Sequence, residues 1–269
     1  MPNGWALQSG TSHFLGQNFA EAFGVYYQTK EATRELVWAT SWGVSTRLLG
    51  AMVMTHSDDA GLVLPPNIAP VQVVLVPMAR KNDEEGVAAV NALVDDVVTI
   101  CEANGIRIKV DDRKNMRPGA KFYEWERKGI PLRVDIGPRD AATQSIIVSS
   151  RIDNEKRTLS VIDKNLAKTF HHLLADIQAH LFTKALNYVH EKTYKVDTYD
   201  DLKARLDKDD LGFFQVYWCA NDQHEKQIKE DCSVTIRCYP ADKQTNLEGK
   251  VCFYSGWPAT HVALFARAF

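Results

Sequence analysis

Apolar and polar positions follow two different periods in the middle of the chain. Residues 71–77 are rich in β-branched apolar side chains, which is typical of a strand covered on both faces. Asp83 can then cap a helix whose apolar residues recur at helical spacing from Val87 to Cys101, and Gly105 can end it.

Pro118 begins a second, shorter predicted helix that reaches about residue 128. Further strands are predicted at residues 106–110, 130–136 and 145–150. Strands and helices at this spacing predict an α/β domain with a mostly parallel or mixed sheet.

The flanking regions carry less regular patterns. Before the α/β region, short strands are predicted around a helix at roughly residues 31–40, and the apolar run at residues 48–55 predicts a buried strand. Pro65 and Pro66 interrupt this pattern, because proline lacks a backbone N–H and restricts the residue before it. A domain boundary is therefore predicted at about Asn67.

A long helical pattern leads into the last region. It runs from Asp163 to about Thr193 and predicts a connecting helix. Strands are then predicted near residues 213–219, 234–238, 251–254 and 262–267, which makes the last region a small α+β domain. The predicted segments are 1–67, 68–162, 163–193 and 194–269.

Composition is that of an ordinary globular protein with more than one domain. Its 269 residues are 45% hydrophobic and 25% charged, and no apolar run is long enough to cross a bilayer. Five cysteines are too few for a disulfide scaffold, which favours a reducing, cytoplasmic setting. The formal net charge of −2 argues against non-specific binding along nucleic acid, although residues 106–140 are locally rich in lysine and arginine.

The segment from Ser41 to Arg47 combines a fixed cation, an aromatic ring and small hydroxyl side chains. Arginine holds phosphate and stacks on aromatic rings, Trp42 can wall a small apolar ligand, and Ser45 can bond ribose or phosphate oxygens. An amide, a hydroxyl and an imidazole lie upstream, at Gln8, Thr11 and His13. This set suits a nucleotide and a small amino acid. The alternative is that Trp42 is core, Arg47 pairs with a surface carboxylate, and the histidine is structural.

Ordered motifs run through the chain. They are Gln8-x-x-Thr11-Ser12-His13-x-x-Gly16-Gln17-Asn18-Phe19, Thr40-Ser41-Trp42-Gly43-x-Ser45-Thr46-Arg47, Met54-Thr55-His56-x-Asp58-Asp59-x-Gly61-Leu62, Pro118-Gly119-x-Lys121-Phe122-x-x-Trp125-Glu126 and Lys195-Val196-Asp197-Thr198-Tyr199. In this order they resemble the prolyl-tRNA synthetase family, in its eukaryotic and archaeal form, over essentially the whole chain. Class II synthetases for glycine or threonine are the related alternative, and the Thr11-Ser12-His13 motif with Trp42 favours proline.

The resemblance implies that residues 1–67 are the C-terminal part of a class II catalytic domain, with its third motif and the end of its antiparallel sheet. The implied ATP-binding residues are Gln8, Thr11, Ser45 and the catalytic Arg47, with Gln8 near a magnesium ion. His13 and Trp42 would contact L-proline. The implied reaction is ATP-dependent ligation of L-proline to its tRNA through a prolyl-adenylate, which needs positioning and charge stabilisation more than a general base.

The family's first and second class motifs would lie upstream of this sequence and supply the dimer interface and a second ATP arginine. We therefore expect a C-terminal portion of a synthetase, homodimeric as the full-length enzyme, that cannot form prolyl-adenylate alone. The alternative function is that of a non-catalytic tRNA-binding fragment. No membrane partner is expected.

The resemblance also makes residues 68–162 an anticodon-binding domain. The residues implied to face the anticodon are Phe122, Glu126, Arg139, Asp140 and Lys156. Phe122 can stack a base and Glu126 can accept from a guanine edge. Compared with the family pattern, Arg139 replaces a usual lysine, and the loop around Lys156 is one residue longer. The alternative is that Phe122 and Trp125 are core and the charges are simply solvated.

The last region contains scattered cysteines. The family resemblance implies a C-terminal domain that binds zinc through four cysteines. In this chain the corresponding positions hold Cys219, His224, Cys252 and Ser255, with Cys232 and Cys238 as possible substitutes. A neutral serine is a very poor zinc ligand, so a degenerate, metal-free version is expected.

Overall fold

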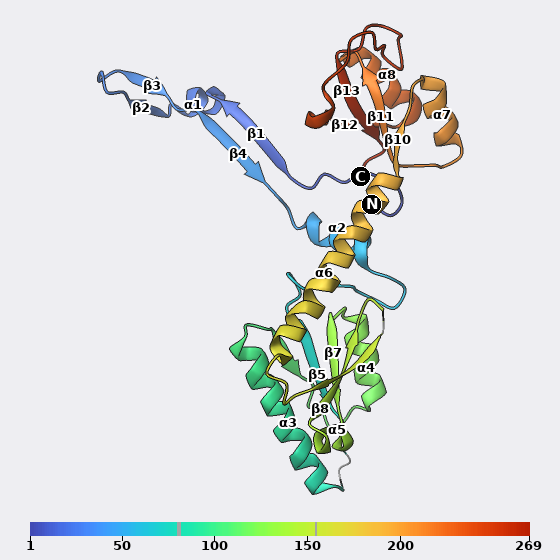
Figure 1. Ribbon diagram of the computed structural model, residues 1–269. Coiled ribbons are helices and arrows are strands. Elements are labelled where there is room, and N and C mark those ends of the chain that lie inside the picture. The colour runs from blue at the N-terminus through green and yellow to red at the C-terminus, as the bar shows by residue number, and fades with distance from the viewer. Residues whose placement is uncertain (80–81, 154) are drawn as a thin grey trace. The chain divides into compact units, whose positions relative to one another are not determined.

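The computed structural model describes residues 1–79, 82–153 and 155–269. They form two compact units, which are described separately below (Figure 1). The central unit is Met52–Tyr188, and the terminal unit combines Met1–Ala51 with Val189–Phe269. Within the described ranges, no helix combines the length and apolarity that a membrane crossing requires.

The central unit contains a five-stranded mixed sheet in the order β6-β5-β7-β8-β9. The strands are β5 (Val73–Pro77), β6 (Ile108–Val110), β7 (Leu132–Ile136), β8 (Ser145–Ser150) and β9 (Lys156–Ser160). β5 pairs in parallel with β6 and β7, whereas β7–β8 and β8–β9 are antiparallel. The mixed α/β sheet expected from the sequence is therefore confirmed, with one additional strand, β9.

Helices cover both faces of this sheet. The helices are α3 (Glu84–Ala103), α4 (Pro118–Arg127), α5 (Pro138–Ala142) and α6 (Leu166–Glu191). Val73 and Leu75 of β5 share a buried core with α3 and α6, while the alternate residues Val74 and Val76 pack with Trp125 of α4. Because successive strand side chains point to opposite faces, α4 lies on the face opposite α3 and α6. The predicted cap at Asp83 is also confirmed, since its carboxylate accepts from the Gly86 N–H at 2.9 Å.

In the terminal unit, residues 193–266 form a four-stranded sheet in the order β10-β11-β13-β12. Its strands are β10 (Thr193–Lys195), β11 (Phe213–Trp218), β12 (Thr235–Cys238) and β13 (His261–Ala266). The helices α7 (Tyr199–Asp207) and α8 (Asp222–Cys232) and the short 3-10 turn η1 (Ala241–Lys243) complete it. Leu202 of α7, Ile228 of α8 and Trp218 of β11 are almost fully buried in one core. The predicted small α+β region is thus present.

The N-terminal part of the same unit is a set of paired strands. The elements are β1 (Thr11–Gly16), α1 (Asn18–Phe23), β2 (Tyr26–Gln28), β3 (Arg34–Leu36), β4 (Ala39–Gly43) and α2 (Arg47–His56), the last of which continues into the central unit. β1 pairs with β4 and β2 with β3, both antiparallel. Ala6 bridges Ala268, which joins the two chain ends within this unit.

Three predicted elements are wrong. The helix expected at residues 31–40 is instead β3 and the start of β4, because pairing with β2 and β1 satisfies an extended backbone there. The strand expected at residues 48–55 is helix α2, which has no buried residue. Leucine, alanine and methionine favour a helix, and short apolar runs do not distinguish the two states. The strand expected at residues 251–254 is a turn, with only Val251 bridging Pro258.

Candidate functional sites

The β1–β4 ribbon brings the predicted nucleotide residues to one place. Its register sets Thr11 opposite Gly43 and His13 opposite Ser41. A hollow of about 370 Å³ results, lined by Gln8, Thr11, His13, Ser45 and Arg47 among others. This volume lies in the range of small-ligand pockets, roughly 300–1,000 Å³. Trp42 lines the adjoining hollow and is 76% exposed, so the alternative that it is core is wrong.

The charge in this hollow comes from a single guanidinium. Arg47 is exposed and forms no ion pair with any residue that the structure describes, so the surface-pair alternative is wrong as well. The lining includes no carboxylate. Gln8 Nε2 donates to Thr11 Oγ1 at 2.7 Å, which fixes these two side chains relative to one another. A free guanidinium next to hydroxyl and amide groups suits an anionic ligand such as a phosphate.

On the central unit, Phe122 and Glu126 lie one turn apart on α4 and are both half-buried. The guanidinium carbon of Arg133 lies 4.1 Å from the centre of the Phe122 ring, which is cation–π geometry. Arg133 Nε donates to Asp135 Oδ1 at 3.0 Å, and Nη2 donates to Ser149 Oγ at 3.5 Å. The aromatic ring is therefore joined to a polar row on the sheet. Phe122 is not fully core, whereas Trp125 is, at 6% exposure.

Strand register places Lys156 in the same polar row. Arg133 of β7 lies opposite Ser149 of β8, and Ser149 lies opposite Lys156 of β9. Asp135 is buried, and desolvation raises the pKa of its carboxyl, while the Arg133 guanidinium opposes that rise. Charges on Lys156 and Asp140 also act on Asp135. The structure thus gathers Phe122, Asp140 and Lys156 around Arg133 and Asp135.

The two neighbouring residues of α5 differ in their surroundings. The Asp140 carboxylate accepts from the Gly137 N–H at 2.8 Å and so closes the start of α5. Arg139 is exposed, and among the residues that the structure describes only its carbonyl has a partner, the Thr143 side chain and N–H. Asp140 is consequently held in place, whereas Arg139 is free to reach a ligand.

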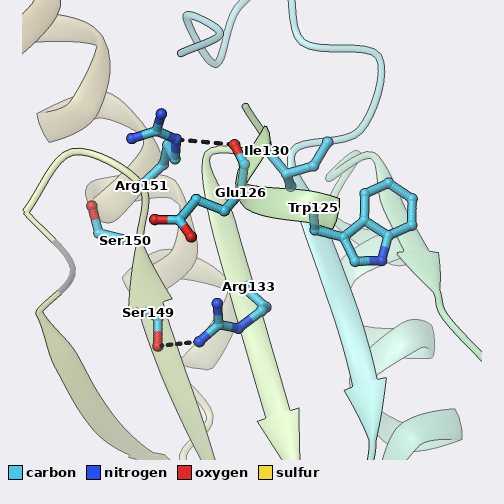
Figure 2. A pocket seen from close by; sticks show the side chains of 7 residues that line it. All are labelled: Trp125, Glu126, Ile130, Arg133, Ser149, Ser150 and Arg151. Carbon is cyan, nitrogen blue, oxygen red and sulfur yellow. Dashed lines mark hydrogen bonds between the residues drawn. The ribbon is translucent and has the colours of Figure 1, made fainter. Parts of the chain in front are cut away.

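A small hollow lies between α4 and the ends of β7 and β8 (Figure 2). Its lining residues are Trp125, Glu126, Ile130, Arg133, Ser149, Ser150 and Arg151. Figure 2 shows the Glu126 carboxylate pointing into the space between Arg151 and Arg133. Within the described ranges, this carboxylate has no hydrogen-bond or ion-pair partner. It therefore remains available as an acceptor beside two guanidinium groups.

A buried ionic network holds α4 against the sheet. The Asp111 carboxylate accepts from Trp125 Nε1 at 2.7 Å and from Arg113 Nε at 2.8 Å. Lys121 Nζ donates to the Asp111 carbonyl at 2.7 Å and lies 3.6 Å from its Oδ1. Sequence reasoning did not identify Asp111. Because it binds two residues of α4, it fixes the rotation of the helix that carries Phe122 and Glu126.

Comparison with known proteins extends these observations. Residues 72–168 match the family model described as anticodon binding domain, and residues 199–269 match the model described as prolyl-tRNA synthetase, C-terminal. The chain corresponds to the C-terminal region of prolyl-tRNA synthetases. A protein named proline–tRNA ligase from Phocaeicola vulgatus is 47% identical over 271 residues, which is all of this chain and 53% of that protein. One of the same name from Chloroflexus aggregans is 44% identical over 270 residues and is covered to 55%. The chain thus spans about half the length of these relatives.

A zinc ion, which the resemblance to prolyl-tRNA synthetases implies for the C-terminal domain, does not fit the donors found here. Cys219 Sγ lies 3.7 Å from His224 Nδ1 and 3.8 Å from Ser255 Oγ. Cys252, three residues before Ser255, is buried. Of the side chains the structure describes, no three from His, Cys, Asp and Glu converge as a metal-binding group. The fourth position holds a neutral hydroxyl, so the set lacks the four ligands of a structural zinc site.

The two remaining cysteines of that domain have other surroundings. Cys232 Sγ lies 3.3 Å from the Tyr199 hydroxyl, which also donates to Asp231 at 2.9 Å. Cys238 is exposed on β12. Neither therefore supplies the missing ligand to the group around Cys219.

Proposed function

We propose that this chain binds the tRNA for proline and reads its anticodon with the α4 face of the central unit. The observation that carries the proposal is the Glu126 carboxylate, which has no partner among the described residues and lies one turn from Phe122, between Arg133 and Arg151. This arrangement lies within the region that matches anticodon-binding domains.

The chemistry of the face suits a single-stranded RNA loop. Proteins read such loops by splaying bases out, stacking them and bonding their edges. Phe122 offers a ring for stacking, Glu126 accepts from the N–H groups of a guanine edge, and Lys156 and Arg139 supply cations for phosphates or base edges. Asp140 completes the residues that we propose to face the anticodon.

We further propose that the chain acts as part of a proline–tRNA ligase of the eukaryotic and archaeal type. Residues 1–67 would end a class II catalytic sheet, followed by segments 68–162, 163–193 and 194–269. ATP would bind at Gln8, Thr11, Ser45 and Arg47, with magnesium near Gln8, and L-proline at His13 and Trp42. In-line attack of the proline carboxylate on the α-phosphate then releases pyrophosphate. The enzyme would be a cytoplasmic homodimer.

A second candidate is tRNA binding without catalysis by the 269-residue chain alone. The observation that favours it is the lining of the hollow around Arg47, which offers one guanidinium and no carboxylate. Adenylate formation needs charge stabilisation on several phosphate oxygens, and binding of the proline amine needs an anionic partner. A class II synthetase for glycine or threonine is the alternative among ligases, and the names of the relatives favour proline.

Replacing Glu126 with alanine tests the anticodon proposal. The expected result is weaker binding of the tRNA for proline by about 1–3 kcal/mol, which is roughly 5–150-fold in Kd. Binding of a tRNA with an unrelated anticodon should change little, because its bases do not use this acceptor. Fluorescence anisotropy at one fixed salt concentration measures both.

Glu102→Ala is the matched control, because it removes an exposed glutamate from α3, on the opposite face of the sheet. It should leave both affinities unchanged. Equal losses on the two tRNAs for Glu126→Ala would exclude Glu126 from base reading.

A further inference from the structure

Arg151 joins three separate stretches of the central unit. Its side chain is only 5% exposed. Its Nε donates to the carbonyl oxygens of Leu62 and Glu126 at 3.1 Å each, the second of which is drawn in Figure 2. Its Nη1 and Nη2 donate to the two carboxylate oxygens of Asp58, at 2.9 and 2.5 Å. One guanidinium therefore binds residues 58–62 to the C-terminal end of α4.

Backbone contacts reinforce this junction. The Leu62 N–H donates to the Arg127 carbonyl at 3.0 Å, and the Leu64 N–H donates to the Gly129 carbonyl at 3.2 Å. A Cβ added at Gly61 would lie 2.5 Å from Arg127 Cα, and one added at Gly129 would lie 2.5 Å from the Leu62 carbonyl oxygen. The two chain segments are thus in close backbone contact at Gly61 and Gly129.

The position of Arg151 connects two features that differ in role. The carbonyl of Glu126, the residue proposed to read a base, accepts from the Gly129 N–H at 2.9 Å and from Arg151 Nε at 3.1 Å. The same guanidinium holds Asp58, which follows the end of α2 with only Ser57 between them. The same guanidinium is therefore in direct contact with both the Glu126 backbone and residues 58–62.

We propose that Arg151 and Asp58 form a coupling latch, through which RNA bound at the Glu126 end of α4 stiffens residues 52–64. The latch rests on the proposed anticodon function, since its ligand is the RNA base that donates hydrogen bonds to the Glu126 carboxylate. Arg151 is a positioning residue, because it acts through the Glu126 backbone and through Asp58. Coupling between sites of this kind typically amounts to about 5–150-fold.

Asp58→Asn is the variant that weakens the ion pair between Arg151 and Asp58 without disturbing the local turn. The Asp58 Oδ1 also accepts from the Ala60 N–H at 3.0 Å, and an asparagine oxygen can keep that bond. The variant removes the negative charge and one of the two acceptors for Arg151. Asp59→Asn is the matched control, because this neighbouring carboxylate is exposed and has no ion pair within the described ranges.

Amide hydrogen exchange of the 269-residue chain, with and without a saturating anticodon stem-loop of a proline tRNA, tests the latch. In the wild type and in Asp59→Asn, the RNA should slow exchange about 5-fold or more in peptides 118–130 and 52–64. In Asp58→Asn it should slow only peptide 118–130. This readout separates coupling from a merely structural role, which would change exchange equally with and without RNA.

Two results would overturn the latch while leaving the proposed function intact. One is RNA binding to the wild type with no change in peptide 52–64. The other is equal slowing of that peptide in Asp58→Asn. Failure of the wild type to bind the stem-loop would overturn the proposed function and the latch together.

Discussion

Asp111→Ala is expected to lower the free energy of unfolding of the central unit by about 3–5 kcal/mol. The substitution leaves the ammonium of Lys121, which is 5% exposed, without its carboxylate, and it removes the acceptor of Trp125 Nε1. Breaking a buried ion pair from one side is costly because the remaining charge stays out of water. Urea unfolding followed by hydrogen exchange of the β5 and β7 amides reports on this unit alone. Asp112→Ala, at the exposed neighbouring carboxylate, should have little effect.

The loss of stability caused by Asp111→Ala should depend on pH, and the lowered pKa of Asp111 gives the direction. Hydrogen bonds from Arg113 and then Trp125 hold the pKa of Asp111 well below its usual value, against the opposing effect of burial. A lowered folded pKa stabilises the protein above the unfolded pKa, about 3.9, and this contribution is lost as the pH falls below it. The stability difference between wild type and Asp111→Ala should therefore shrink below about pH 4. A difference that stays constant from pH 7 to pH 3 would contradict the assigned role of Asp111.

Arg47→Ala is expected to abolish most adenylate chemistry where the rest of a catalytic domain is supplied. A suitable host is the Phocaeicola vulgatus relative with its matching 271 residues replaced by this chain. Loss of one group that stabilises developing charge typically costs about 10²–10³-fold in kcat. Proline-dependent ATP–pyrophosphate exchange measures it directly.

Arg34→Ala is the control for this experiment, because Arg34 is an exposed arginine on β3 outside the hollow around Arg47. It should leave exchange close to that of the unmodified chimera. A chimera that is active with alanine at position 47 would remove Arg47 from the ATP site. The isolated 269-residue chain is expected to show no exchange in either form.

The regular part of the fold could be predicted from the sequence because its signals are local. The β-branched run of β5, the Asp83 cap of α3 and Pro118 at the start of α4 each specify their element within a few residues. The segment at residues 31–56 could not be predicted in this way. Its short apolar runs fit either state: residues 34–43 became strands by pairing with β1 and β2, whereas residues 47–56 formed helix α2.

Some candidate site residues are likewise indicated by a local sequence pattern, whereas others are defined only by contacts between distant parts of the chain. The strand Leu132–Ile136 alternates charged and apolar residues, so Arg133 and Asp135 could have been found as a polar row on one face. Arg151 and Asp58 are 93 positions apart, and no local pattern indicates that they meet. Asp111 is likewise defined by its contacts with α4, which depend on how that helix packs.

The proposed function requires that this chain distinguish the anticodon of proline tRNA from other anticodons. The most direct measurement is the Kd of the wild-type chain for a proline anticodon stem-loop and for the same stem-loop with its anticodon bases replaced, at one salt concentration. We expect binding at least about 10-fold tighter for the proline anticodon, since each misread base costs about 1–3 kcal/mol. Equal affinity for the two stem-loops would contradict it.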